Sequence, residues 1–129
     1  YLKNTKNLEL MLEAAEGEVI RQWWYPDVAH AVNKDYKDHT GIVLTLGKGA
    51  ADTISEKQKI NTKSTTESEL VGADAATTKS LWYKYFFEAQ GYKTEVVILQ
   101  DNTSTIHLEK NGKESSSKCT HHIDIHHFF

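Results

Sequence analysis

Short apolar and β-branched runs separated by polar turns fill the first sixty positions of the chain. The runs Glu18–Tyr25 and Gly41–Ala50 are typical of strands, and Ala51–Lys59 alternates enough to form the return strand of a hairpin or meander. The polar stretch Val32–Gly41 predicts a turn between the first two. Leu8–Ala14 alternates only in part, so it predicts an edge strand, although a helix would suit the same residues.

The middle of the chain carries a strong signal for one long helix. Ser64 and the two threonines after it can cap a helix, and Glu67 supplies an acid in the first turn. The pattern continues to Gly91, a typical helix end. The face from Leu70 to Tyr85 changes from small to large residues, which predicts close packing against a sheet at the start of the helix.

The remaining pattern predicts a strand, a short helix and a last strand. Thr94–Asp101 is a nearly continuous apolar run, which indicates a strand buried on both faces. Asn102 can cap a short helix that ends at Gly112, and Thr120–Ile125 is long enough for one more strand. This order of elements predicts one α/β domain over residues 1–129, in which helices pack against a mixed sheet.

Composition excludes several classes of protein. The chain has 39% hydrophobic and 26% charged residues, as ordinary globular domains do. We expect no membrane partner and no secretion, because there is neither a signal peptide nor an apolar run of roughly 20 residues. Cys119 is the only cysteine, so an internal disulfide is excluded. The net charge of -3 is not typical of a nucleic-acid-binding protein, and Arg21 is the only arginine.

Four acids lie where a sheet would gather side chains. Asp27 follows a predicted strand after Pro26, Asp101 closes another, Asp124 lies in the last one, and Glu69 lies in the first turns of the long helix. If the strands of Asp27 and Asp101 are neighbours, their carboxylates come within several ångströms, which is costly without a cation and suits Mg²⁺. Four such acids can hold two metal ions roughly 3.5–4 Å apart. Most acids of this kind are simply solvated, so the pattern alone leaves both readings open.

Several segments carry a family resemblance. The stretches Asp38–Ala50 (DHTGIVLTLGKGA), Ser64–Leu70 (STTESEL), Gln100–Ile106 (QDNTSTI) and His122–Ile125 (HIDI) occur in this order. Together they resemble the ribonuclease H domain of copia-type LTR retrotransposon polyproteins, over essentially the whole chain. The resemblance implies a ribonuclease H-like fold, a five-stranded mixed sheet flanked by helices, with the first three strands antiparallel. It also implies a fragment of a longer polyprotein whose C-terminal helix is truncated.

The resemblance also implies a catalytic site. Its catalytic and metal-binding residues would be Asp27, Glu69, Asp101 and Asp124, which would hold two Mg²⁺ ions, with Mn²⁺ as a substitute. The resemblance places the glutamate at Glu69, just before Leu70, rather than at Glu67. Residues two apart on a helix point to different faces, so only one of these two can join the group. The implied reaction is two-metal hydrolysis of the RNA strand of an RNA–DNA hybrid, which leaves a 5′ phosphate and a 3′ hydroxyl.

The implied partners are an RNA–DNA hybrid and the reverse transcriptase domain of the same polyprotein. The implied location is the cytoplasm, within a virus-like particle, or the nucleus. Substrate selection in such enzymes depends on 2′-hydroxyls and hybrid shape rather than on base sequence. The candidate nucleic-acid contacts are Lys57, Lys59, Lys63, Asn102 and Ser104. For each of the three lysines, a solvated basic face is an equal alternative.

The chain departs from the family pattern in two regions. Pro26 precedes a predicted ligand in a central strand, where proline removes a ladder donor, and His30 replaces an aromatic or small residue. Near the end, Cys119, His121 and His126 replace basic residues. These changes match base transitions at CG-containing codons, so one hypothesis is a non-catalytic remnant, decayed or domesticated. Codons at these positions that contain no TG or CA dinucleotide would exclude decay.

The C-terminal stretch also raises the possibility of a zinc-binding module. Its candidate ligands are Cys119, His121, His122, His126 and His127. All of them lie within nine residues, with one sulfur and no second ligand arm, whereas zinc modules hold the metal between two separated pairs. Structural zinc is therefore the least supported alternative.

Overall fold

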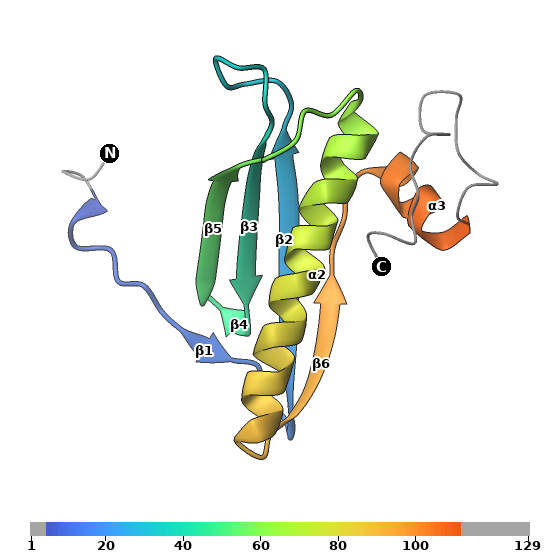
Figure 1. Ribbon diagram of the computed structural model, residues 1–129. Coiled ribbons are helices and arrows are strands. Elements are labelled where there is room, and N and C mark those ends of the chain that lie inside the picture. Colours follow the sequence, from blue (N-terminus) through green and yellow to red (C-terminus); the bar gives the residue numbers. More distant parts are fainter. Residues whose placement is uncertain (1–4, 112–129) are drawn as a thin grey trace.

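The computed structural model describes residues 5–111 as a mixed α/β arrangement (Figure 1). The predicted last strand, Thr120–Ile125, lies outside the described residues. The described elements, in chain order, are β1 (Glu13–Ala14), β2 (Val19–Ala29), β3 (His39–Thr45), β4 (Gly47–Lys48), β5 (Asp52–Lys57), α2 (Thr65–Ala89), β6 (Lys93–Ile98) and α3 (Thr103–Asn111). The predicted class, helices against a mixed sheet, is confirmed.

The main sheet has four strands in the order β5-β3-β2-β6. Strand β3 is antiparallel to both β2 and β5, whereas β6 is parallel to β2. Short turns suffice for the antiparallel neighbours, and the parallel pair requires a crossover, which α2 provides. The three strands of this sheet that precede the long helix are therefore antiparallel, and the strand after it is parallel to the first of them.

The long helix begins and ends where its sequence predicts. Ser64 is the N-cap, and its side chain accepts a hydrogen bond from the Glu67 backbone nitrogen at 3.2 Å. The Glu67 carboxylate in turn accepts one from the Lys63 backbone nitrogen at 2.7 Å, so one free donor of the first turn and one just before the N-cap are satisfied. The helix ends at Ala89, and Gly91 takes a left-handed φ of 88° that favours glycine.

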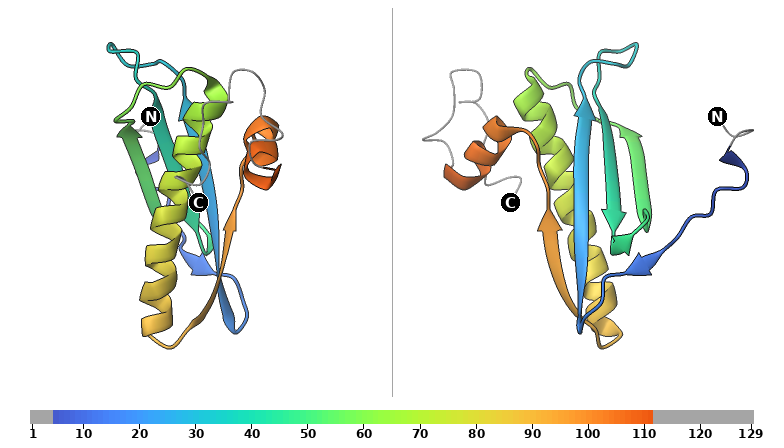
Figure 2. Two further views of the ribbon diagram at one scale, coloured as in Figure 1. Left: turned by 45° about the vertical axis from the view of Figure 1, so that its right-hand side comes forward. Right: turned by 180° about the vertical axis from the view of Figure 1, so that it is seen from behind.

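Helix α2 packs on one face of the sheet, and in Figure 2 no described helix covers the other face. The buried centre of the interface is Trp24, Ile42, Leu44 and Ala76, with the Tyr83 ring edge-on to Trp24 at 5.5 Å. Small residues on the helix allow the close approach that was expected. The prediction that large residues continue the same packed face is wrong, because Leu81 and Tyr85 are exposed. The face of α2 that packs on the sheet instead runs through Ala76, Ser80 and Tyr83.

Two predicted strands differ in the structure. Within Leu8–Ala14 only β1 is extended, and it pairs with β4 outside the main sheet. Leu8, Leu10 and Leu12 have the spacing of one apolar strand face, yet all three are exposed. Strand β6 is only partly buried, contrary to prediction, because it is an edge of the described sheet and α2 covers one face.

No helix within residues 5–111 is long and apolar enough to cross a membrane.

Candidate metal and nucleic-acid site

Asp27 and Asp101 lie just past the paired part of two neighbouring parallel strands. The ladder between β2 and β6 ends at the pair Trp24 and Ile98, after which the Leu99 nitrogen donates to the Trp24 carbonyl at 2.8 Å. Each aspartate follows its strand's last paired residue by three positions. Since parallel strands run in register, both carboxylates reach the same end of the sheet. Both residues are exposed.

Glu69 completes the group from the first turns of α2. Its side chain is buried, with 9% of the residue exposed. Gln100 Nε2 donates to Glu69 Oε2 at 3.4 Å, and the Val28 backbone also hydrogen-bonds this carboxylate. Burial raises the pKa of Glu69, and the charges of Asp101 and Asp27 raise it further against the effect of the two hydrogen bonds. The three predicted carboxylates are therefore close enough to repel one another.

The segment around Asp101 is held by two side chains. Gln100 Oε1 accepts from the Asn102 backbone nitrogen at 3.0 Å. Asn102 Oδ1 accepts from the backbone nitrogens of Ser104 at 3.0 Å and Thr105 at 3.2 Å, so Asn102 caps α3 as predicted. The Asn102 side chain, a candidate nucleic-acid contact, thus has a structural role, and Ser104 is exposed in the first turn of α3.

The donor set suits a hard divalent cation. Within residues 5–111, no group of three or more histidine, cysteine, aspartate or glutamate side chains is already gathered closely enough to hold a metal ion. However, two exposed carboxylates lie beside a buried one whose pKa their charges raise. Oxygen ligands of this kind are those that Mg²⁺ prefers, and a cation would offset the repulsion. Asp27, Glu69 and Asp101 therefore fit the metal by their chemistry.

Pro26 is accommodated in the central strand. It pairs with Ile42 of β3 and is buried. Alternate residues of a strand direct their backbone groups to the same side, so the Pro26 nitrogen faces β6, as the Trp24 carbonyl does. The β6 ladder has already ended at Trp24, so the missing donor falls beyond the last paired residue. In a continued parallel ladder the next bond would be donated by the nitrogen of residue 26, which proline cannot supply, so the β2–β6 ladder ends where Pro26 stands.

The three candidate lysines lie away from the acids. Lys57 Nζ forms an ion pair with Asp35 Oδ2 at 3.0 Å, and both side chains are about half exposed. Lys59 is exposed on the segment that follows β5, and Lys63 immediately precedes the N-cap of α2. Strand β5 is the edge of the sheet opposite β6. Lys57 and Lys59 therefore lie at or just past the sheet edge opposite β6, and contact of the three lysines with nucleic acid stays a prediction.

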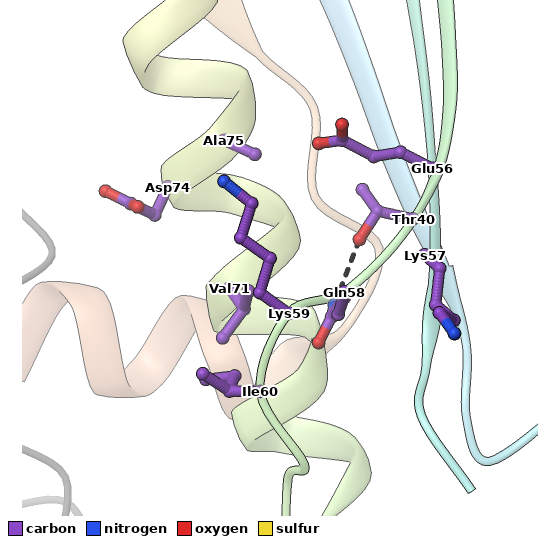
Figure 3. Close-up of a pocket in the computed structure, with 9 residues that line it drawn as sticks. All are labelled: Thr40, Glu56, Lys57, Gln58, Lys59, Ile60, Val71, Asp74 and Ala75. Atoms are coloured by element: carbon purple, nitrogen blue, oxygen red, sulfur yellow. Dashed lines mark hydrogen bonds between the residues drawn. The ribbon is translucent and has the colours of Figure 1, made fainter. Parts of the chain in front are cut away.

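A pocket of about 350 Å³ opens between the end of β5 and α2 (Figure 3). Lys57 and Lys59 line it on one side and Asp74 on the helix side. Burial raises the pKa of Asp74. Beneath them, Gln58 Nε2 donates to Thr40 Oγ1 at 3.0 Å, the bond that is dashed in Figure 3.

Sequence reasoning missed Asp38, which it placed only in a turn. This residue is 1% exposed, and its Oδ1 accepts from the Ala31 nitrogen at 2.6 Å and contacts His30 Nδ1 at 2.9 Å. Its Oδ2 accepts from Ser68 Oγ at 2.7 Å and from the Thr62 hydroxyl. Burial acts to raise the pKa of Asp38, but these hydrogen bonds outweigh it and lower the pKa. The hydroxyl donors lie far along the chain, so no local pattern could reveal them.

Asp124, the fourth predicted ligand, lies outside the described residues, as do Cys119 and the four histidines of the same stretch. Its role and the zinc alternative stay predictions.

No protein-family profile matches the chain. No curated protein and no solved structure is significantly similar to it.

Proposed function

We propose that this chain is a ribonuclease H of the copia-type retrotransposon class, which hydrolyses the RNA strand of RNA–DNA hybrids with two Mg²⁺ ions. One observation carries the proposal. Asp27, Glu69 and Asp101 come from a strand, a helix and a loop far apart in sequence, yet the charges of both aspartates raise the pKa of Glu69. The proposal is supported because three of the four residues predicted as metal ligands lie toward one end of the sheet.

The order of elements supports the same proposal. Three antiparallel strands followed by a long helix are compatible with the arrangement that the family resemblance implies, and the sheet is mixed because β6 is parallel to β2. The ribonuclease H-like fold would be completed by a fifth strand at Thr120–Ile125, which contains Asp124, the proposed fourth ligand.

The site residues have distinct roles in this proposal. Two bound Mg²⁺ ions, or Mn²⁺ in their place, would supply an activated water and stabilise the leaving 3′ oxygen. Glu69 is a buried ligand oriented by Gln100 and the Val28 backbone, whereas Asp27 and Asp101 are exposed where a phosphate backbone can reach them. The charges of Asp101 and Asp27 contribute to the raised pKa of Glu69, and bound cations would favour the ionised form of this carboxylate.

The proposed partners follow from this activity. The substrate is an RNA–DNA hybrid, and the natural context is a polyprotein that includes a reverse transcriptase. The proposed location is the cytoplasmic virus-like particle or the nucleus. Pro26 keeps its place opposite Ile42 in the β2–β3 pairing, so the strand that carries Asp27 is retained despite the proline.

A substrate panel tests the proposal. A labelled RNA strand would be incubated with protein and Mg²⁺ in three forms, as a hybrid with DNA, as an RNA duplex and as a single strand, beside a DNA duplex of the same sequence. We expect cleavage of the RNA strand of the hybrid alone, with 5′-phosphate and 3′-hydroxyl ends, and none with a chelator. Equal cleavage of all four substrates, or none of the hybrid, would overturn the proposal.

A further inference from the structure

One buried carboxylate connects the two segments that carry Asp27 and Glu69. Asp38 binds the end of β2 through Ala31 and the start of α2 through Ser68. We propose that Asp38 is a positioning residue for the metal site, setting the distance between the Asp27 and Glu69 carboxylates without touching metal or substrate. The inference rests on the proposed function, because that function defines the site.

On the strand side, Asp38 fixes the chain immediately after Asp27. Its Oδ1 accepts from the Ala31 nitrogen at 2.6 Å and lies 2.9 Å from His30 Nδ1. Ala31 has a φ of 52°, a left-handed conformation that is unfavourable for a residue with a Cβ. Such strain persists only where surrounding contacts impose it. The Asp38 bond is one such contact, and it holds the chain two residues beyond the end of β2.

On the helix side, Asp38 fixes the residue before Glu69. Ser68 is buried, its hydroxyl donates to Asp38 Oδ2 at 2.7 Å, and its carbonyl oxygen accepts from Gln58 Nε2 at 3.0 Å. The Gln58 backbone nitrogen also donates to the Asp38 carbonyl at 2.9 Å. Ser68 is therefore anchored through both its side chain and its backbone, and Glu69 follows it in the same turn.

A third contact closes the arrangement. The Val28 backbone, next to Asp27, hydrogen-bonds the Glu69 carboxylate directly. The relative position of Asp27 and Glu69 is thus set by Val28 on one side and by the Ala31–Asp38–Ser68 connection on the other. Metal ligands lose affinity when the groups that orient them are removed, typically by about 10–100-fold.

A matched pair of variants tests this role. Ser68→Ala and Thr62→Val each remove one hydroxyl donor from Asp38 Oδ2, but only Ser68 belongs to the helix that carries Glu69. Mn²⁺ binding would be followed by electron paramagnetic resonance without substrate. The Mg²⁺ concentration that gives half-maximal hybrid cleavage, and the melting temperature, would be measured in parallel.

We expect Ser68→Ala to weaken Mn²⁺ binding and to raise the half-maximal Mg²⁺ concentration roughly tenfold, with Thr62→Val within about twofold of wild type. A purely structural role would lower both melting temperatures and leave metal binding unchanged in the folded protein. If the two variants bind the metal equally well while the wild type is active, the positioning role of Asp38 is overturned and the proposed function is not. A wild type that neither binds Mn²⁺ nor cleaves the hybrid overturns the proposed function and this role with it.

Discussion

Gln100 joins Glu69 to the segment that carries Asp101. Its side-chain nitrogen donates to Glu69 Oε2 at 3.4 Å, while its side-chain oxygen accepts from the Asn102 backbone nitrogen at 3.0 Å. An amide can satisfy both neighbours because it has a donor and an acceptor. Gln100 therefore orients the buried carboxylate and favours its ionised form.

Replacement of Gln100 with leucine should shift the pH dependence of activity. The lost hydrogen bond lowers the pKa of Glu69, so its removal raises that pKa further and leaves more Glu69 protonated at mildly acidic pH. We expect the acidic limb of the rate profile to move to higher pH, with a much smaller loss at pH 8. Gln90→Leu, at the exposed far end of α2, is the control. A loss of equal size at every pH would contradict this role.

Glu69→Gln should remove activity and yet stabilise the fold at neutral pH. Burial raises the pKa of Glu69 in the folded state, so the folded protein binds this proton more tightly than the unfolded chain does. Stability is therefore lost as the pH rises through the interval between the unfolded and folded pKa values, and glutamine avoids this loss. We expect a gain of about 1 kcal/mol at pH 7 in urea unfolding, which disappears below the pKa of an ordinary glutamate.

Addition of Mg²⁺ should make the wild type more stable than Glu69→Gln. A cation that binds only the folded wild type stabilises it by mass action, whereas Glu69→Gln lacks a ligand and gains less. Melting curves with and without Mg²⁺ measure the difference. A variant that gains as much as wild type would exclude Glu69 from the metal site.

Asp38→Asn should destabilise the fold at neutral pH, whereas Glu69→Gln should stabilise it. Hydrogen bonds lower the pKa of Asp38 in the folded protein, so its contribution is fully present above the unfolded value, near 3.8, and is lost as the pH falls through the folded pKa. We expect the variant to lose on the order of 2 kcal/mol at pH 7, with a smaller difference from wild type in strong acid. Asp35→Asn, at an exposed ion pair, should leave stability at pH 7 nearly unchanged. A difference between Asp38→Asn and wild type that does not vary with pH would contradict the assignment.

Gly72→Ala should be destabilising although alanine favours helices. A Cβ at this position would lie 2.6 Å from Val28 Cγ2, and a β-branched side chain cannot easily move aside. We expect a loss of about 1–3 kcal/mol in urea unfolding, larger than the gain of about 1 kcal/mol in helix propensity. In a Val28→Ala background the same substitution should be neutral or stabilising. Equal losses in both backgrounds would show that the contact is not the cause.

The sequence predicts those parts of the fold that depend on local signals. Ser64 and Gly91 mark the two ends of α2 because capping and left-handed φ are local properties. The apolar runs likewise predict β2, β3, β5 and β6 within a few residues. The burial of side chains is predicted less well than the elements are. Tyr85 and the apolar residues of β6 are not fully buried, because the described part of the chain supplies no second layer to cover them.

The candidate site divides in the same way. Asp27, Glu69 and Asp101 are predicted as site residues from motifs. The nearness of Asp27 to Asp101 depends on the pairing of β2 with β6, which the sequence offers only as a condition. Asp38 could not be predicted, because its Ser68 partner is 30 positions away and either residue alone suits an ordinary turn or helix start. The groups that orient the ligands are therefore a result of the tertiary structure.

The most direct test of the central claim compares the initial rate of hybrid cleavage in Mg²⁺ for wild type, Asp27→Asn and Asp35→Asn. Asparagine keeps the shape of aspartate and removes its charge, and Asp35 controls for loss of a carboxylate elsewhere on the surface. We predict a loss of roughly 100-fold or more for Asp27→Asn and a rate within about twofold of wild type for Asp35→Asn. Equal rates for wild type and Asp27→Asn would contradict the metal site described for this fold.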